Sequence, residues 1–129
     1  MAFRATLNLE GKEVRILGCN YALQQDIDAT GRPSSEVRGG TIQFEVESTD
    51  DTSFFEWMID SWALKSGDIT FYKRDEQSKL KELKFEDAYI ISYAENFDSL
   101  GDNPMSESFV ISAKKISMGS GSHENPWPI

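Results

Sequence analysis

The chain holds a single histidine and a single cysteine, the residue types that most often supply a catalytic base or a reactive thiol. His123 lies in a glycine- and serine-rich segment beside Glu124 and Asn125, without the neighbouring nucleophile that a hydrolytic site requires. Cys19 occupies an apolar position in an alternating segment, where cysteine is more often a small buried residue than a nucleophile. We therefore expect no catalytic residues and no enzymatic activity.

Two pairs of carboxylates could in principle share a proton or hold a cation: Asp26 with Asp28, and Asp50 with Asp51. Neither pair has the spaced oxygen ligands of a calcium loop. The first pair borders a polar loop, and the second precedes an apolar segment, where a helix start uses such side chains as caps. Because one cysteine cannot build a thiolate cluster or an intrachain disulfide, we expect neither a metal site nor a cofactor.

Two glycine-containing stretches, residues 39–40 and residues 119–122, could suggest phosphate-binding loops. Neither ends in Gly-Lys-Ser/Thr, so neither predicts a nucleotide site. Residues 119–122 also look like an artificial linker, but the sequence ENPWPI that follows does not, and we interpret the tail as native.

Length, composition and charge narrow the class of protein. The 129 residues predict one domain, residues 1–129, and 39% apolar with 12% aromatic residues is typical of a folded chain. A net charge of −9 disfavours binding to nucleic acid and to anionic membranes. No segment approaches the roughly 20 apolar residues of a membrane span, so we expect no membrane insertion. Residues 1–9 alternate in polarity, which predicts no signal peptide and synthesis in the cytoplasm.

The elements that would position any site are mostly strands, because apolar residues recur with a period of two. We expect strands at 3–9, 14–17, 19–27, 42–46, from 69 to about 73, 80–83, 88–97 and 105–118. The turn Glu10-Gly11-Lys12 makes a hairpin of the first two. A change of period after Thr49-Asp50-Asp51 predicts one short α-helix. The expected fold is mainly β: a small barrel of about eight strands with one helix.

Residues 28–40 form the longest segment without a period, at a length where structureless connections are usually functional. It carries Arg32 and Arg38 in an otherwise acidic protein, which makes it the first place to expect a partner. Each arginine could form a forked ion pair with an acidic surface of an adjacent subunit.

Large apolar surfaces indicate further contacts. The expected helix has a wider apolar stripe than one core-facing side needs, made of Phe54, Phe55, Trp57, Met58, Ile59 and Trp62. The helix is either deeply buried or shared with another subunit. Residues 88–97 look apolar on both faces, with Tyr89, Ile91, Tyr93 and Phe97 on one of them. Trp57, Trp62 and Trp127 are the candidate interface aromatics, although Trp127 could equally be a packing anchor.

Several segments resemble the haemolysin-coregulated protein family, also called TssD, and most of all its Bacteroidetes branch. They are DATGRPSS at 28–35, RGGTI at 38–42, EVEST at 45–49, FEWM at 55–58, and the closing His123, Asn125 and Trp127. The resemblance implies a phage-tail-tube-like barrel that is the structural subunit of the type VI secretion inner tube. It also implies self-assembly into stacked hexameric rings that carry effector proteins, with a contractile sheath and a spike protein as partners.

The resemblance further implies that the protein is secreted by the type VI apparatus without a signal peptide. The polar loop maps onto the extended loop of the family, which reaches a neighbouring subunit or ring. Its candidate interface residues are Asp28, Thr30, Gly31, Arg32, Pro33, Val37, Arg38 and Gly39. The alternative is a small-molecule carrier, because a barrel of about eight strands can enclose one ligand, with the aromatic helix as a lid.

Overall fold

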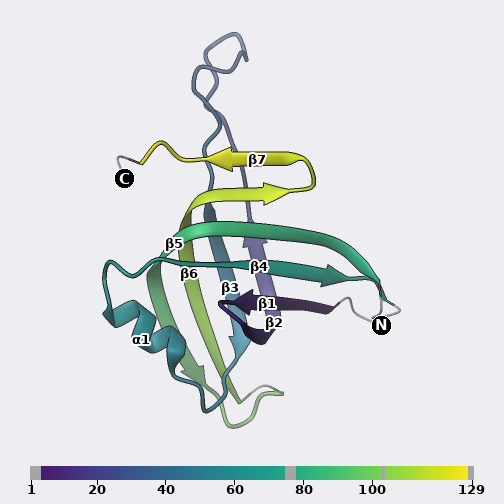
Figure 1. Ribbon diagram of the computed structural model, residues 1–129, viewed down its shortest axis with the longest axis vertical. Helices are drawn as coiled ribbons and strands as arrows, with labels where there is room; N and C mark the ends of the chain where they lie inside the picture. Colours follow the sequence, from purple (N-terminus) through teal and green to yellow (C-terminus); the bar gives the residue numbers. More distant parts are fainter. Residues whose placement is uncertain (1–3, 75–77, 103, 128–129) are drawn as a thin grey trace.

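A computed structural model of the chain describes residues 4–74, 78–102 and 104–127. Along the chain the elements are β1 (Arg4–Leu9), β2 (Lys12–Tyr21), β3 (Thr41–Glu47), α1 (Ser53–Ile59), β4 (Lys65–Tyr72), β5 (Lys79–Phe97), β6 (Met105–Met118) and β7 (Gly121–Glu124). The strands pair in the order β3-β2-β1-β4-β5-β6-β7, and an additional pairing of β3 with β6 closes the barrel (Figure 1). The predicted mainly-β barrel with one short helix is confirmed.

The seven described strands differ from the expected eight in two ways. The segments 14–17 and 19–27 are parts of one strand, β2, which ends at Tyr21, and the segments 80–83 and 88–97 are both parts of β5. The tail after Met118 turns back on β6 as β7, a strand that its glycine-rich sequence did not predict. The expected start of the first strand at Phe3 lies outside the described residues.

The first hairpin forms as predicted. Leu9 pairs with Lys12, and the two residues between them, Glu10 and Gly11, have φ angles of 48° and 91°. Positive φ at both central positions is the requirement of a type I′ turn, whose twist matches that of the flanking strands.

The expected face assignment of residues 88–97 is wrong, because β5 contains a bulge. Ile90 pairs with Ile111 but Ser92 pairs with Val110, so Ile91 is an extra residue without a partner on β6. One extra residue inverts the alternation beyond it. Tyr93 therefore faces the interior opposite the buried Phe109, while Ile91 is exposed.

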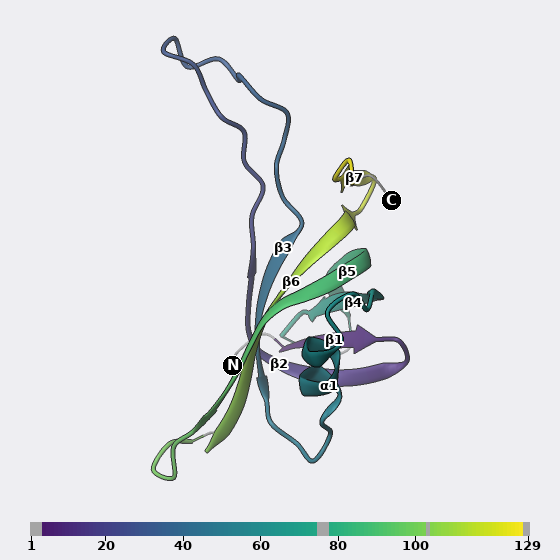
Figure 2. The same cartoon turned by 90° about the vertical axis from the view of Figure 1, so that its left-hand side faces the viewer.

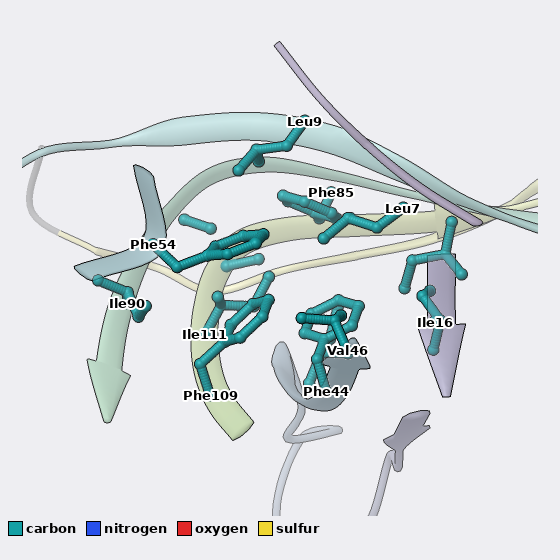
Figure 3. Close-up of a cluster of buried hydrophobic side chains, with 14 of the residues drawn as sticks. Leu7, Leu9, Ile16, Phe44, Val46, Phe54, Phe85, Ile90, Phe109 and Ile111 are labelled. Carbon is teal, nitrogen blue, oxygen red and sulfur yellow. The ribbon is translucent and has the colours of Figure 1, made fainter. Parts of the chain in front are cut away.

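The barrel interior is filled with apolar side chains (Figure 3). The ring of Phe109 lies 4.9 Å from that of Phe44 and 4.3 Å from that of Phe54, which α1 extends into the core. The carrier alternative needs an enclosed ligand cavity, and these stacked rings occupy the place where the ligand would lie. The N-cap residue of α1 is Thr52, which makes no side-chain capping bond. Oδ1 of Asp51, one residue earlier, instead accepts the N–H of Ser53 at 2.9 Å, so the expected carboxylate supports the start of the helix without being its cap.

Glu107 is a buried carboxylate at the edge of this core, 4% exposed. It accepts a 2.8 Å hydrogen bond from the Tyr93 hydroxyl. Burial raises the pKa of Glu107, and the negative charges of Glu95 and Asp51 raise it further, against the opposing effect of the Tyr93 bond. A carboxyl whose pKa is higher in the folded than in the unfolded state stabilises the fold at low pH. That contribution is lost as the pH rises through the folded pKa.

We therefore expect Glu107→Gln to raise Tm relative to the wild type at pH 7. The difference should shrink as the pH falls through the raised pKa of Glu107 and should be gone below about 4.5, the ordinary glutamate value. The amide oxygen of glutamine can still accept the bond from Tyr93. Thermal melts from pH 4 to pH 8 measure the difference, with the exposed Glu47→Gln as the charge-matched control. A pH-independent difference between wild type and Glu107→Gln would contradict the assignment.

Candidate functional site

Residues 22–40, here called the arm, leave the barrel between β2 and β3 and extend along the longest axis of the molecule (Figures 1 and 2). The arm is longer than the predicted loop 28–40. Its two sides are joined by reciprocal backbone bonds between Gln24 and Arg38, of 3.0 and 2.7 Å, and by a bridge between Ile27 and Pro33. The bridges are isolated, so the arm is a narrow two-sided ribbon without a core of its own.

The tip of the arm is shaped by Asp28. Its Oδ1 accepts bonds from the N–H of Thr30 at 2.8 Å, the hydroxyl of Thr30 at 2.7 Å and the N–H of Arg32 at 3.2 Å. These donors lower the pKa of Asp28. Gly31 completes the turn with φ of 87°. Asp28, Thr30 and Gly31 therefore fix the conformation of the tip.

The two arginines of the arm differ. Nη2 of Arg38 lies 2.8 Å from Oδ2 of Asp26 on the opposite side of the arm, so this arginine already has a partner within its own chain. The Arg32 side chain is exposed, and in the part of the chain that the structure describes no ion pair involves it. The contact of both arginines with another subunit stays a prediction, and Arg38 would enter it already paired with Asp26.

The base of the arm is fastened to the other end of the chain. Nδ2 of Asn125 donates to the carbonyl oxygens of Gly39 at 3.0 Å and Ala113 at 3.1 Å. The N–H of Ala113 donates to the Gly40 carbonyl at 2.7 Å. We call these bonds the Asn125 clamp. In the sequence, Asn125 stood out only as one of the closing residues of the family resemblance, and no local signal indicated its contact with Gly39.

The three candidate interface tryptophans lie in different environments. Trp57 is 3% exposed, and its Nε1–H donates to the Ala63 carbonyl at 3.0 Å. It belongs to the core, which corrects its assignment to an interface. Trp127 packs on Tyr89, with ring centroids 5.5 Å apart, and so is a packing anchor for the tail. Trp62 is 81% exposed and touches Tyr89 with its edge.

One face of the sheet formed by β2, β3, β6 and β5 points away from the core. Its paired rows carry small or uncharged residues with a single acid: Asn20, Gln43, Val110 and Ser92 in one row, and Gly18, Glu45, Ser108 and Ala94 in the next. They line a shallow hollow on this face. We call it the open face.

A profile of the family described as "Hemolysin coregulated protein Hcp (TssD)" matches residues 1–128. The chain belongs to the Hcp family. It is similar to Hcp1 from Flavobacterium johnsoniae, with 49% identity over 95% of this chain and 99% of that chain, and a TM-score of 0.91. Hcp1 from Salmonella typhimurium is 12% identical over 96% of this chain and 95% of that one, with a TM-score of 0.78.

A chain of the anti-feeding prophage baseplate shares the fold at 11% identity, with 91% of each chain covered and a TM-score of 0.57. No protein with a curated function matches the chain significantly. The predicted family and its Bacteroidetes-like branch are confirmed by the profile and by the Flavobacterium structure. The protein is therefore a structural subunit of the type VI secretion tube.

The reactive residues of this Hcp chain are packed into its structure. Cys19 is half-buried on β2, and burial raises the pKa of its thiol to about 11. Nε2 of His123 lies 3.1 Å from Oδ1 of Asn125, the residue of the clamp. Within residues 4–74, 78–102 and 104–127 no three potential ligands gather as a metal site. In the same ranges no helix has the length and apolarity to cross a membrane.

Proposed function

We propose that this Hcp subunit closes into a ring of six copies and that the rings stack into a tube that carries effector proteins. The match of the Hcp family to residues 1–128 carries the proposal. It is supported by the likeness to the anti-feeding prophage baseplate, whose structure is described as 6-fold symmetrised. In this assembly the open face lines the lumen. Its small and mostly uncharged side chains would form no strong, specific contacts with an effector that moves through the tube.

The proposal includes partners and a route. Residues 1–129 act as one tube domain without catalytic residues or cofactor, in contact with a contractile sheath, a spike protein and effectors. The chain is made in the cytoplasm and leaves through the apparatus without a signal peptide. Light scattering at micromolar concentration, followed by electron microscopy of the particles, tests the ring. A strictly monomeric mass would contradict it.

We further propose that the arm is the contact between subunits. Its interface residues are Asp28, Thr30, Gly31, Arg32, Pro33, Val37, Arg38 and Gly39, and Trp62 is a second contact. The arm extends away from the barrel, so most of its surface meets nothing in its own chain. Arg32 supplies the unpaired charge, which can form a forked pair with a carboxylate of the adjacent copy. Arg38 and Asp26 instead keep the two sides of the arm together.

Replacement of Arg32 by glutamate is expected to weaken ring or tube formation while leaving circular dichroism and Tm unchanged. A desolvated interfacial pair that loses one partner costs about 2 to 5 kcal/mol, against about 0 to 1 kcal/mol for an exposed pair. Sedimentation at several protein concentrations measures the concentration at which rings or tubes form. Arg32→Lys keeps the positive charge but cannot form two parallel hydrogen bonds to a carboxylate, so its assembly should be weaker than that of the wild type and stronger than that of Arg32→Glu. If Arg32→Glu assembles at the same protein concentration as the wild type, then Arg32 contacts only solvent.

A further inference from the structure

We propose that the tip of the β5–β6 hairpin of one subunit docks into an apolar groove at the base of the arm of the next copy along the tube. The inference rests on the proposed stacking of rings and names the surfaces that would join them. It concerns two features that the barrel itself does not use: a groove at the base of the arm and a set of exposed apolar side chains at the tip of the β5–β6 hairpin.

The groove lies between the base of the arm and β7. Its apolar lining consists of Tyr21, Leu23, Val37, Leu83, Ile116 and Met118. Leu83 and Ile116 belong to the barrel core, so the groove opens directly onto the core at a place where β7 and the arm are not paired. Leu23 and Val37 form its rim and are exposed. An apolar side chain entering here would be buried against the core and leave water.

The hairpin tip between β5 and β6 presents the matching apolar surface. Phe97 is 69% exposed and Leu100 is 95% exposed, and Met105 beside them is also exposed. The turn that carries Leu100 is held in place by Asp98. Its Oδ1 accepts the N–H of Leu100 at 3.0 Å, and its carbonyl accepts the N–H of Gly101 at 3.2 Å. The leucine is thus projected from an ordered turn, which limits the entropy lost on docking.

The hairpin tip lies at one end of the longest axis, and the groove lies at the base of the arm, toward the other end. The arm extends from one end and the β5–β6 hairpin from the other, and both views show this arrangement (Figures 1 and 2). The hairpin tip therefore cannot reach the groove of its own chain. A second copy placed head to tail along this axis brings its tip to the groove of the first. A head-to-tail contact without closure repeats indefinitely and builds a column, as a tube requires.

The charges near the two surfaces are complementary. From residue 94 to residue 113 the sequence has no lysine or arginine, while Glu95, Asp98 and Asp102 surround the tip. The groove adjoins a second hollow through their shared residues Ser117 and Met118. That hollow is lined by Lys79, Lys81 and Lys84 and by one acid, Glu82, which lies 3.5 Å from Lys79 and 4.0 Å from Lys84, so its lining keeps a net positive charge. An acidic tip and a basic border favour this orientation of the two copies and disfavour tip against tip.

The test is a pair of introduced cysteines, Leu100→Cys with Val37→Cys, treated at pH 7 with a short bis-maleimide under conditions where the wild type forms stacked rings. Stacking should give a denaturing-gel ladder that extends beyond six chains, because each subunit is joined to the one above and the one below. The wild type is the first control, because it measures any cross-linking through Cys19, a half-buried thiol whose pKa is raised by burial. Leu100→Cys with Ile59→Cys, an exposed residue of α1, is the second.

A ladder that stops at six chains would place the contact within a ring and overturn the inference, as would the absence of a ladder. Leu100→Asp gives an independent measurement: electron microscopy should show single rings of normal size and at least a tenfold loss of stacked particles. Leu64→Asp, an exposed leucine outside both surfaces, should stack normally. If Leu100→Asp stacks like the wild type, the inference fails while the ring proposal stands. If the wild type forms no rings, the proposed function itself fails.

Discussion

Replacement of Phe109 by alanine is expected to lower the free energy of unfolding by about 4 kcal/mol, the range found for large aromatic truncations in protein cores. Phe109 lies in the middle of a stack, between Phe44 on β3 and Phe54 on α1. Its loss removes a packing partner from two elements at once, so neither can collapse fully into the cavity. For a chain of this size the change corresponds to a fall in Tm of about 15 °C.

Urea unfolding followed by tryptophan fluorescence measures the loss. Phe55→Ala is the matched control, because Phe55 is the next residue on α1 after Phe54 and is exposed, touching Tyr93 only by an edge contact at 5.9 Å. Phe55→Ala should lower the free energy of unfolding by less than about 1 kcal/mol. Equal losses in the two variants would mean that α1 is not docked through the aromatic stack. Helix α1 should also become more accessible to protease in Phe109→Ala, since that stack attaches it to the barrel.

Replacement of Gly40 by alanine is expected to destabilise the fold by about 3 kcal/mol, through backbone strain and a steric clash together. Gly40 has φ of 101°, where a side chain is strained. A Cβ atom there would lie 2.6 Å from the Ala113 carbonyl oxygen and 2.7 Å from Nδ2 of Asn125. The substitution therefore breaks the Asn125 clamp at the base of the arm, and assembly should fail at temperatures where the barrel is still folded.

Gly31→Ala separates the two causes. Gly31 has a similar φ of 87°, but no atom lies within 4 Å of the added Cβ. Gly31→Ala should lower the free energy of unfolding by about 1 kcal/mol, through backbone strain alone. Thermal melting compares the stabilities, and hydrogen exchange at residues 22–40 reports the freedom of the arm. Similar melts for the two variants, with the arm equally protected, would show that the contacts at Gly40 give way easily.

Much of the fold follows from local signals. The turn at Glu10-Gly11, the strict alternation of β3 and the change of period at α1 each have a local physical cause, and all three were predictable. The bulge at Ile91 was not, because residues 88–97 look apolar on both faces, and the adjacent Ile90 and Ile91 also fit a regular strand covered on both sides. Its effect reaches every later residue of the strand, which is why Tyr93 was assigned to the wrong face.

The candidate interface shows the same limit. The arm was predictable from its turn-forming residues, but the difference between its two arginines depends on the side of the arm where Asp26 lies. The clamp depends on a contact between residues 86 positions apart. Trp57 and Trp62 occur in one apolar segment, and only the docking of α1 decides that the first is buried and the second exposed. Contacts of this kind follow from tertiary structure and not from local sequence.

The Asn125 clamp also sets an order of events in the life of the chain. The arm is made from residues 22–40, but the side chain that fastens its base follows Gly39 by 86 positions. Until Asn125 has been made, the arm has no fixed base and so does not present a complete contact surface. A chain that stops short of residue 125 would lack the clamp, and we expect it to join a growing tube poorly.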